Sequence, residues 1–95
     1  MSAYLIADVE VYDQNVYAEY RRQVLPLIQK HGGRFIVRGG AHEVLEGDWR
    51  PRRLVIIEFP DMATLKSWYQ SPEYAKLIAL RQGASRGSIV AVEGA

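Results

Sequence analysis

Charged side chains that could do acid–base chemistry lie inside three segments that are otherwise apolar. Asp8, Arg38 and Glu58 each interrupt a run of hydrophobic residues. An isolated ion is costly to bury, so these charges must pair if that side of the fold is covered. We expect Arg38 to satisfy Glu58 and, beyond it, Asp8. Such a cluster is either a structural set of ion pairs or a polar site with a perturbed carboxylate.

Two further residues join Arg38 and Glu58 as candidates for catalysis. His42 follows a pair of glycines and could act as a base near the mouth of a cleft, although a solvated loop histidine gives the same pattern. Tyr69 keeps a polar end that could point into a cleft between helices and sheet. The pattern does not choose among these four, so the catalytic residue stays open.

Aromatic residues and one more arginine are the candidates for ligand binding: Trp49, Trp68, Tyr69 and Arg81. An exposed indole is costly without a partner, so Trp49 is expected to pack across a subunit interface or to line a pocket. Trp68 is also typical of a core residue. Arg81 could hold a carboxylate by a bidentate contact, or simply neutralise Glu58 or Glu46.

Several kinds of site lack the residues they need. The chain has no cysteine, which removes disulfides, thiolate nucleophiles and thiolate metal sites. Its two histidines have no second ligand at zinc-like spacing, and no nucleotide-binding glycine motif is present, so no metal and no cofactor is expected. The string G-x-S-x-G at residues 83–87 lacks the preceding strand and following helix of a nucleophile elbow. A helix-to-strand loop explains it better.

Size and charge restrict the partners. Ninety-five residues make one domain, residues 1–95, and 48% of them are hydrophobic. The net charge is +1, and the basic turn at residues 50–53 carries no interleaved aromatics, so nucleic acid is not expected as a partner. No apolar run approaches the length of a membrane span. A cytoplasmic protein without membrane contact is the default expectation.

Hydrophobic periodicity predicts the elements that position these residues. Residues 4–12 alternate as a strand, Asp13 caps a helix that ends at Gly32, and Pro26 is expected to kink that helix. Residues 34–38 and 54–59 are predicted strands. The pattern leaves open whether His42 to Glu46 extends the strand at residues 34–38 through a bulge. Short helices follow Asp61 and Ser71, and residues 88–92 close the chain as a strand. This βαββαβ order predicts an α+β, ferredoxin-like fold: an antiparallel four-stranded sheet with helices on one face.

The parity of the strand residues predicts a homodimer. Odd-numbered positions are uniformly apolar and suit the face beneath the helices. The even-numbered positions are mixed, with hydrophobes beside the three charges: Tyr4, Ile6, Asp8, Glu10, Ile36, Arg38, Leu54, Ile56 and Glu58. A face with this many hydrophobic residues is not expected to remain exposed to solvent. A second copy of the chain packed against it is the simplest way to bury it.

The ordered motifs GGRFIVRGG, EVLEGDW, RRLVIIEFPD and WYQSPEY, followed by Arg81, resemble the bacterial domain of unknown function family 1330. The resemblance spans almost the whole chain. It rests on matching positions Arg38, Gly39, Gly40, Glu46, Gly47, Trp49, Glu58, Phe59, Trp68, Tyr69, Ser71, Tyr74 and Arg81. It implies a dimeric α/β barrel in which two sheets meet with helices outside. The resemblance implies no reaction. Related branches of the dimeric α/β-barrel superfamily include cofactor-free monooxygenases, but a shared fold does not establish a shared function.

Two functions fit this sequence. One is a small cofactor-free enzyme or binder of an aromatic or carboxylated metabolite held in each protomer's cleft. The other is a non-enzymatic dimeric module, a ligand sensor or accessory subunit, whose polar residues are structural. A concave pocket with a perturbed ionisable group would favour the first, and a closed, fully paired network the second.

Overall fold

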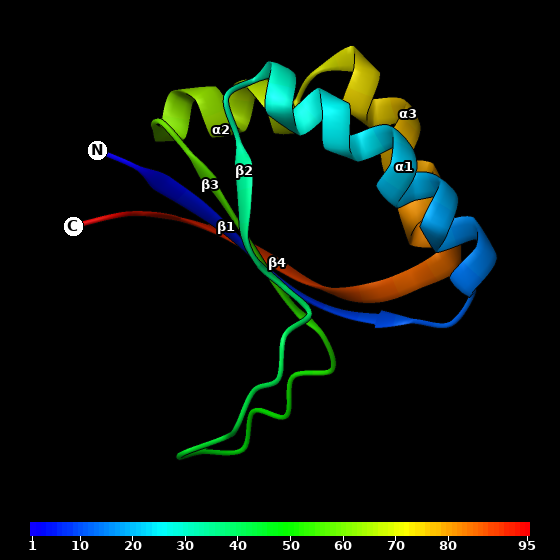
Figure 1. Ribbon diagram of the computed structural model, residues 1–95, viewed down its shortest axis with the longest axis vertical. Coiled ribbons are helices and arrows are strands. Elements are labelled where there is room, and N and C mark those ends of the chain that lie inside the picture. The colour runs from blue at the N-terminus through cyan, green and yellow to red at the C-terminus, as the bar shows by residue number, and fades with distance from the viewer.

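The computed structural model describes every residue, Met1–Ala95, as one α+β domain. Its elements are β1 (Ala3–Val11), α1 (Gln14–Lys30), β2 (Arg34–Arg38), β3 (Leu54–Phe59), α2 (Met62–Tyr69), α3 (Pro72–Ala84) and β4 (Ser85–Glu93). The strands form one sheet in the order β2-β3-β1-β4, and each neighbouring pair is antiparallel. All three helices lie on one side of this sheet (Figure 1). The predicted ferredoxin-like arrangement is confirmed.

Local capping explains where the helices begin and end. Asp13 accepts a hydrogen bond from Val16 N, and Asp61 accepts one from Thr64 N, so each side chain satisfies an otherwise unpaired donor of the first turn. Gly32 takes the left-handed conformation, φ +78°, just after α1. Pro26 does not interrupt α1, because the helix continues past it to Lys30.

The core lies between the helices and the inner face of the sheet. Leu5, Val55 and Ile57 project from the two central strands and are at most 6% exposed. Helices α1, α2 and α3 close over them with large side chains, among them Ile28, Trp68 and Tyr74. This confirms the predicted apolar face on β1 and β3, because their odd-numbered residues do point toward the helices.

A β-bulge in β2 reverses that parity. Phe35 lies opposite Ile57, but Val37 lies opposite Ile56 and Arg38 opposite Val55, so Ile36 is the extra residue. Residues directly opposite in an antiparallel pair share a face. Arg38 therefore points to the helix side, and the prediction that it shares the outer face with Asp8 and Glu58 is wrong.

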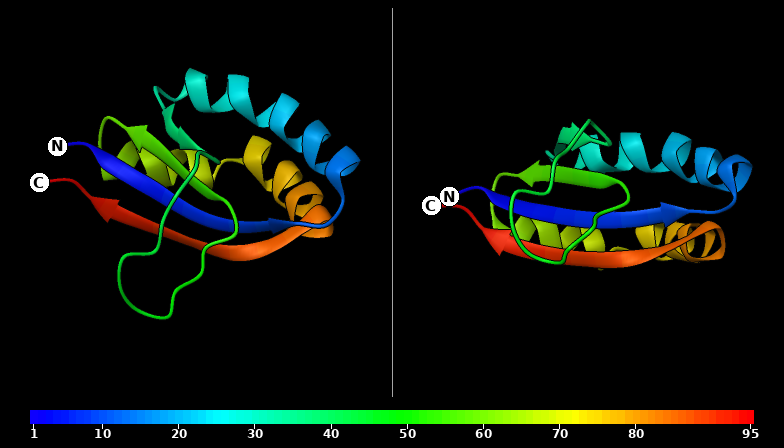
Figure 2. Two further views of the ribbon diagram at one scale, coloured as in Figure 1. Left: turned by 60° about the horizontal axis from the view of Figure 1, so that its bottom comes forward. Right: turned by 90° about the horizontal axis from the view of Figure 1, so that it is seen from below.

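The outer face of the sheet carries the long β2–β3 loop, residues 39–53. In Figures 1 and 2 this loop extends from the sheet on the side opposite the helices. It contains no strand, so His42 to Glu46 does not extend β2. Beside it the face exposes apolar side chains, including 58% of Val90 and 43% of Val92.

Helix α3 runs directly into β4 without a connecting loop. The helix ends at Ala84 and the strand begins at Ser85, earlier than the predicted start at Ser88. The carbonyl of Ala84 accepts hydrogen bonds from both Tyr12 N and Asp13 N, at 3.0 and 3.1 Å. The end of α3, the start of β4 and the β1–α1 turn therefore meet at one oxygen atom.

No helix of the structure combines the length and the apolar character that a membrane span requires.

Candidate functional site

A cavity of about 80 Å³ lies between α1, α3 and the inner face of the sheet. Its floor is formed by apolar residues of β1 and β3, and its roof by α1 and α3. Fourteen of its eighteen lining residues are hydrophobic, and the other four are all arginines: Arg21, Arg38, Arg53 and Arg81. No carboxylate and no histidine lines the cavity, so its electrostatic character is positive within apolar walls.

Two tyrosines join the helices across the roof. The hydroxyls of Tyr20 on α1 and Tyr74 on α3 lie 2.8 Å apart, and both side chains are buried. Burial raises the pKa of Tyr20, and the neighbouring Tyr74 raises it further. Burial also raises the pKa of Tyr74, although its hydrogen bond to Tyr20 opposes the shift. Both phenols are therefore neutral near pH 7 and offer hydrogen bonds rather than negative charge.

Two buried donors at this cavity have no hydrogen-bond partner: Trp68 Nε1 and Arg81 Nε. Trp68 is only 1% exposed, and its ring packs on Phe59 and Tyr74 with centroids 5.3 and 4.2 Å away. Most buried polar groups in proteins are satisfied. The unsatisfied pair therefore points to an acceptor atom, such as a carboxylate or carbonyl oxygen, that would occupy the cavity.

The remaining three arginines come from α1, the end of β2 and the residue before β3, and we call their side of the cavity the entrance; Arg21 and Arg38 are exposed there, and Arg53 is half-buried. The bulge directs Arg38 there, where its guanidinium carbon stacks 3.9 Å from the centre of the Phe35 ring. The guanidinium carbons of Arg21 and Arg53 lie 5.7 and 6.0 Å from the centre of the Tyr17 ring. Aromatic faces thus support cationic groups at the entrance.

The glycine after Arg38 makes room for this arrangement. Gly39 has φ +68°, and a Cβ atom on it would lie 2.7 Å from Arg53 Nε. Its N–H also donates to the carbonyl of Leu54 at 2.7 Å, which closes the end of the β2–β3 ladder. Gly39 is therefore required by backbone conformation and by the position of Arg53 together.

The expected Asp8–Arg38–Glu58 cluster does not form. Glu58 is held instead by Arg34 Nε at 2.7 Å and by Tyr4 OH at 3.2 Å, and the hydrogen bond from Arg34 holds its pKa below the usual range. Asp8 bonds to the β2–β3 loop. The physical reason is the bulge, which moves Arg38 through to the other face of the sheet.

Other predicted site residues lie away from the cavity. His42 sits in the exposed loop, with Nε2 3.1 Å from the carbonyl of Pro51. Trp49, 58% exposed, donates from Nε1 to Asp8 Oδ2 at 2.8 Å on the outer side of the sheet. Tyr69 packs edge-on against Trp68 but does not line the cavity. Of the sequence candidates, the cavity brings together Arg38, Trp68 and Arg81.

Arg81 pairs with neither Glu58 nor Glu46, because no salt bridge includes it. The serine of the G-x-S-x-G string is also accounted for. Ser85 is buried, and its Oγ donates to the carbonyl of Arg81 at 2.7 Å. That hydroxyl completes the end of α3 and has no histidine beside it.

Three polar residues of the cavity, Tyr20, Arg21 and Arg53, are among those that were not predicted as site residues. The sequence pattern places Tyr20 only on the apolar side of a helix and Arg53 only in a solvated turn, and it does not single out Arg21. A usable signal was present for the first of them. Tyr17 and Tyr20 place two phenols one turn apart on a buried helix face, where each hydroxyl needs a partner. Nothing in the local sequence shows that Arg53 turns inward.

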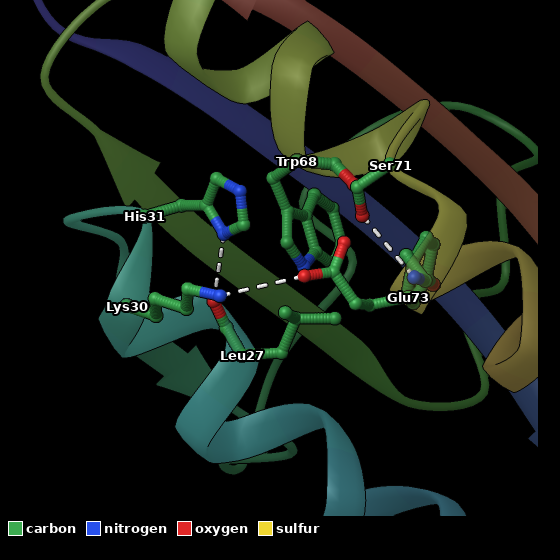
Figure 3. Close-up of polar contacts among 7 residues, drawn as sticks. Leu27, Lys30, His31, Trp68, Ser71 and Glu73 are labelled. Atoms are coloured by element: carbon green, nitrogen blue, oxygen red, sulfur yellow. Dashed lines mark hydrogen bonds and ion pairs between the residues drawn. The ribbon is translucent and has the colours of Figure 1, made fainter.

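The two roof helices are also tied at the end of α1. Lys30 Nζ lies 3.4 Å from Glu73 Oε2, and His31 Nδ1 lies 3.0 Å from the carbonyl of Leu27 (Figure 3). Ser71 caps α3 by accepting from Tyr74 N, and its hydroxyl donates to the carbonyl of Trp68. The two Ser71 contacts join the backbone of Trp68, near the end of α2, to the first turn of α3. No group of three or more His, Cys, Asp or Glu side chains is arranged to hold a metal ion.

The family model for Domain of unknown function (DUF1330) matches residues 2–95. The chain belongs to this family. The match takes in all but the first residue of this DUF1330 chain and confirms the resemblance inferred from the motifs. No match was found among curated proteins.

Solved structures show the same fold at low sequence identity. RPA0582 of Rhodopseudomonas palustris, of unknown function, is 20% identical with a TM-score of 0.80, covering 99% of this chain and 82% of that one. SnoaB of Streptomyces nogalater, described as a cofactor-independent oxygenase, is 7% identical with a TM-score of 0.68, covering 99% and 93%. A dimeric ferredoxin-like protein of unknown function from Jannaschia sp. CCS1 is 12% identical with a TM-score of 0.64, covering 99% and 100%. These similarities establish a ferredoxin-like fold.

Proposed function

We propose that this DUF1330 domain binds a small aromatic or otherwise apolar acid in the cavity between its helices and its sheet. The observation that carries the proposal is the pair of unsatisfied buried donors, Trp68 Nε1 and Arg81 Nε. Leaving a buried donor unpaired costs about 1–3 kcal/mol, and more when the group is charged. A carboxylate oxygen between these donors would remove that cost, and the apolar walls would take the body of the molecule.

The size of the cavity limits its occupant. Its volume of about 80 Å³ is below the roughly 300–1,000 Å³ typical of small-molecule pockets. Arg21 at the entrance is exposed and its side chain is long, so its movement can enlarge the space. A compact acid of one ring or less suits the enclosed part, with any further group extending past the arginines.

If a carbonyl oxygen of the ligand, rather than its carboxylate, accepts from these donors, they promote a reaction in which negative charge develops on that oxygen. Fixed donors in a site screened from water stabilise an enolate or similar anion more than its neutral precursor. Such stabilisation is what a cofactor-free oxygenation of an activated substrate needs, and SnoaB, with this fold, is described as a cofactor-independent oxygenase. We therefore propose a cofactor-free enzyme acting on the bound acid.

A second candidate is a ligand-sensing or accessory module that uses the same cavity. The observation that favours it is the lack of any carboxylate or imidazole among the lining residues. Without such a base, deprotonation of the ligand would have to come from solvent or from the ligand itself. Oxygen consumption in the presence of a bound acid separates the two functions, because only the enzyme would show it.

We also propose that the domain is a homodimer. The supporting features are the exposed apolar residues on the outer sheet face and the description of the Jannaschia relative as dimeric. A standard interface buries about 800 Å² on each partner. The four-stranded outer face together with the β2–β3 loop offers a surface of that order.

Calorimetric titration with a panel of monocyclic aromatic acids tests the binding proposal. We expect at least one acid to bind the native protein, and Arg81→Gln to weaken that binding about tenfold or more, because a charge-assisted contact is lost. Trp68→Phe should weaken it less, since only one neutral donor is removed. Arg22→Gln is the matched control, as Arg22 lies on the exposed side of α1 and pairs with Glu19. Equal affinity in Arg81→Gln and native protein would overturn the proposal.

A further inference from the structure

The arginines of this molecule differ in what they contact. Of the nine in the chain, four pair with carboxylates: Arg22, Arg34, Arg52 and Arg86. Arg50 bonds to backbone carbonyls. The remaining four are those that line the cavity, and none of them is in a salt bridge. The chain has eleven acidic residues, yet none lines the cavity, so four arginines outside any salt bridge line one small space.

Only part of this charge is used by the site proposed above. That site places Arg81 and Trp68 at the buried end, where one carboxylate would be held. Arg38, Arg53 and Arg21 at the entrance have no role in holding it. Like charges in one site repel one another, so an assembly of this kind is stabilised by bound anion.

Arg38 and Arg53 at the entrance are each held by a neighbouring group. The guanidinium carbon of Arg38 lies 3.9 Å from the centre of the Phe35 ring, and its N–H groups can donate to an anion. Arg53 is fixed through its backbone, since its carbonyl accepts from Val9 N at 3.0 Å. Its side chain occupies the space left by the missing Cβ of Gly39. Two guanidiniums on the same side of the cavity can each donate to a carboxylate.

We infer that the ligand is a dicarboxylic acid, with one carboxylate held by Arg81 and Trp68 and the other by Arg38 and Arg53 at the entrance. This inference rests on the proposed function, because it assigns a second subsite to the same cavity. Arg21 adds positive charge beside the entrance subsite. The apolar body of the ligand lies between the two ends, against the walls formed by α1 and the sheet.

Three matched probes test the second subsite by calorimetry: phenylacetate, 1,4-phenylenediacetate and the monomethyl ester of 1,4-phenylenediacetate. The ester keeps the size of the diacid and removes one charge. We expect the diacid to bind the native protein about tenfold or more tighter than either monoanion, since a charge-assisted contact is added. Terephthalate, a shorter diacid, checks the span between the subsites.

Variants then separate this inference from the proposed function. Arg38→Gln and Arg53→Gln should each lower the ratio of diacid to ester affinity, whereas Arg81→Gln should weaken every probe. Arg22→Gln should keep the native ratio. If both diacids bind no tighter than the ester while Arg81→Gln still weakens binding, the second subsite is wrong and the proposed function stands. If no probe binds the native protein, or Arg81→Gln changes nothing, both fall.

Discussion

Trp49 donates a hydrogen bond from its indole nitrogen to Asp8 Oδ2 across 2.8 Å, which joins the β2–β3 loop to the outer face of β1. The backbone N–H of Arg52 donates to the other oxygen of the same carboxylate at 2.9 Å. The Asp8 side chain, on the central strand β1, thereby binds the β2–β3 loop at two residues, Trp49 and Arg52. Asp8 is consequently a loop anchor rather than a member of an ion-pair cluster.

Replacing Trp49 by phenylalanine should raise the pKa of Asp8. Partial burial raises that pKa, but the hydrogen bonds from Trp49 and from the backbone outweigh burial and hold it below its usual value of 3.8. Because these bonds exist only in the folded state, they stabilise the fold above pH 3.8 and that contribution is lost as the pH falls through the lowered value. An NMR titration of the Asp8 carboxyl measures the shift, with Asp61 as an internal reference. An unchanged Asp8 titration would contradict the contact.

The substitution Val90→Asp should convert a dimer to a monomer while the protomer stays folded. Val90 is 58% exposed, and it lies opposite Ile6 on the outer sheet face, so an aspartate there costs the protomer little but places an unpaired charge in the proposed interface. Light scattering should give twice 10.8 kDa for the native protein and 10.8 kDa for the variant. Ala79→Asp, on the exposed side of α3, should remain dimeric. A native protein that is monomeric at micromolar concentration would refute the dimer.

The neighbouring glycines 39 and 40 should respond differently to alanine. Gly39→Ala should lower the free energy of unfolding by about 1–3 kcal/mol, because the backbone is left-handed there and the new Cβ would displace Arg53. A Cβ atom on Gly40 would meet no other atom within 4 Å, and the φ of Gly40 is not positive. Gly40→Ala should therefore change stability by less than about 1 kcal/mol. Urea denaturation compares the two, and equal effects would show that the conformation of Gly39 is not as described.

Removing either hydroxyl of the Tyr20–Tyr74 pair should destabilise the domain, and removing both should cost less than the sum. Each phenylalanine substitution leaves the other buried hydroxyl without its partner, which costs about 1–3 kcal/mol. In the double variant no stranded hydroxyl remains. Unfolding free energies of the two single variants and the double variant measure this coupling. Strict additivity would mean that the two hydroxyls do not depend on each other.

Arg38→Ala should leave stability within about 1 kcal/mol of the native value, because the guanidinium is exposed and only stacks on Phe35. No carboxylate depends on it. Arg34→Ala, by contrast, should raise the pKa of Glu58, since the hydrogen bond that lowers it is removed. Chemical denaturation and an NMR titration of Glu58 provide the two readouts. A loss of more than about 3 kcal/mol in Arg38→Ala would restore the buried-cluster interpretation.

Most of the fold follows from local chemistry that the sequence displays. Asp13, Asp61 and Ser71 mark helix starts, and Gly32 marks a helix end, because each satisfies or relaxes the backbone within one turn. The parity of β1 and β3 was likewise predictable, since alternation in a regular strand needs no long-range information. These signals lie within a few residues of the feature that they predict.

The site depended on one irregularity that local chemistry does not display. The extra residue at Ile36 is set by how β2 and β3 align, and neither strand carries a glycine or proline at that point. Parity alone therefore placed Arg38 on the wrong face, and the basic composition of residues 50–53 placed Arg53 in a solvated turn. Trp68 and Arg81 were recognised as candidates because an indole and a guanidinium carry N–H donors that need hydrogen-bond acceptors in any environment.

The carbonyl of Ala84 joins the two roof helices at one end. It belongs to the last residue of α3 and accepts from the turn that precedes α1, and β4 begins at the next residue. At the other end they are joined by the exposed Lys30–Glu73 pair, and such pairs contribute about 0–1 kcal/mol. The two helices should therefore separate first at the Lys30–Glu73 end, and more easily as salt rises, because salt screens that exposed ion pair.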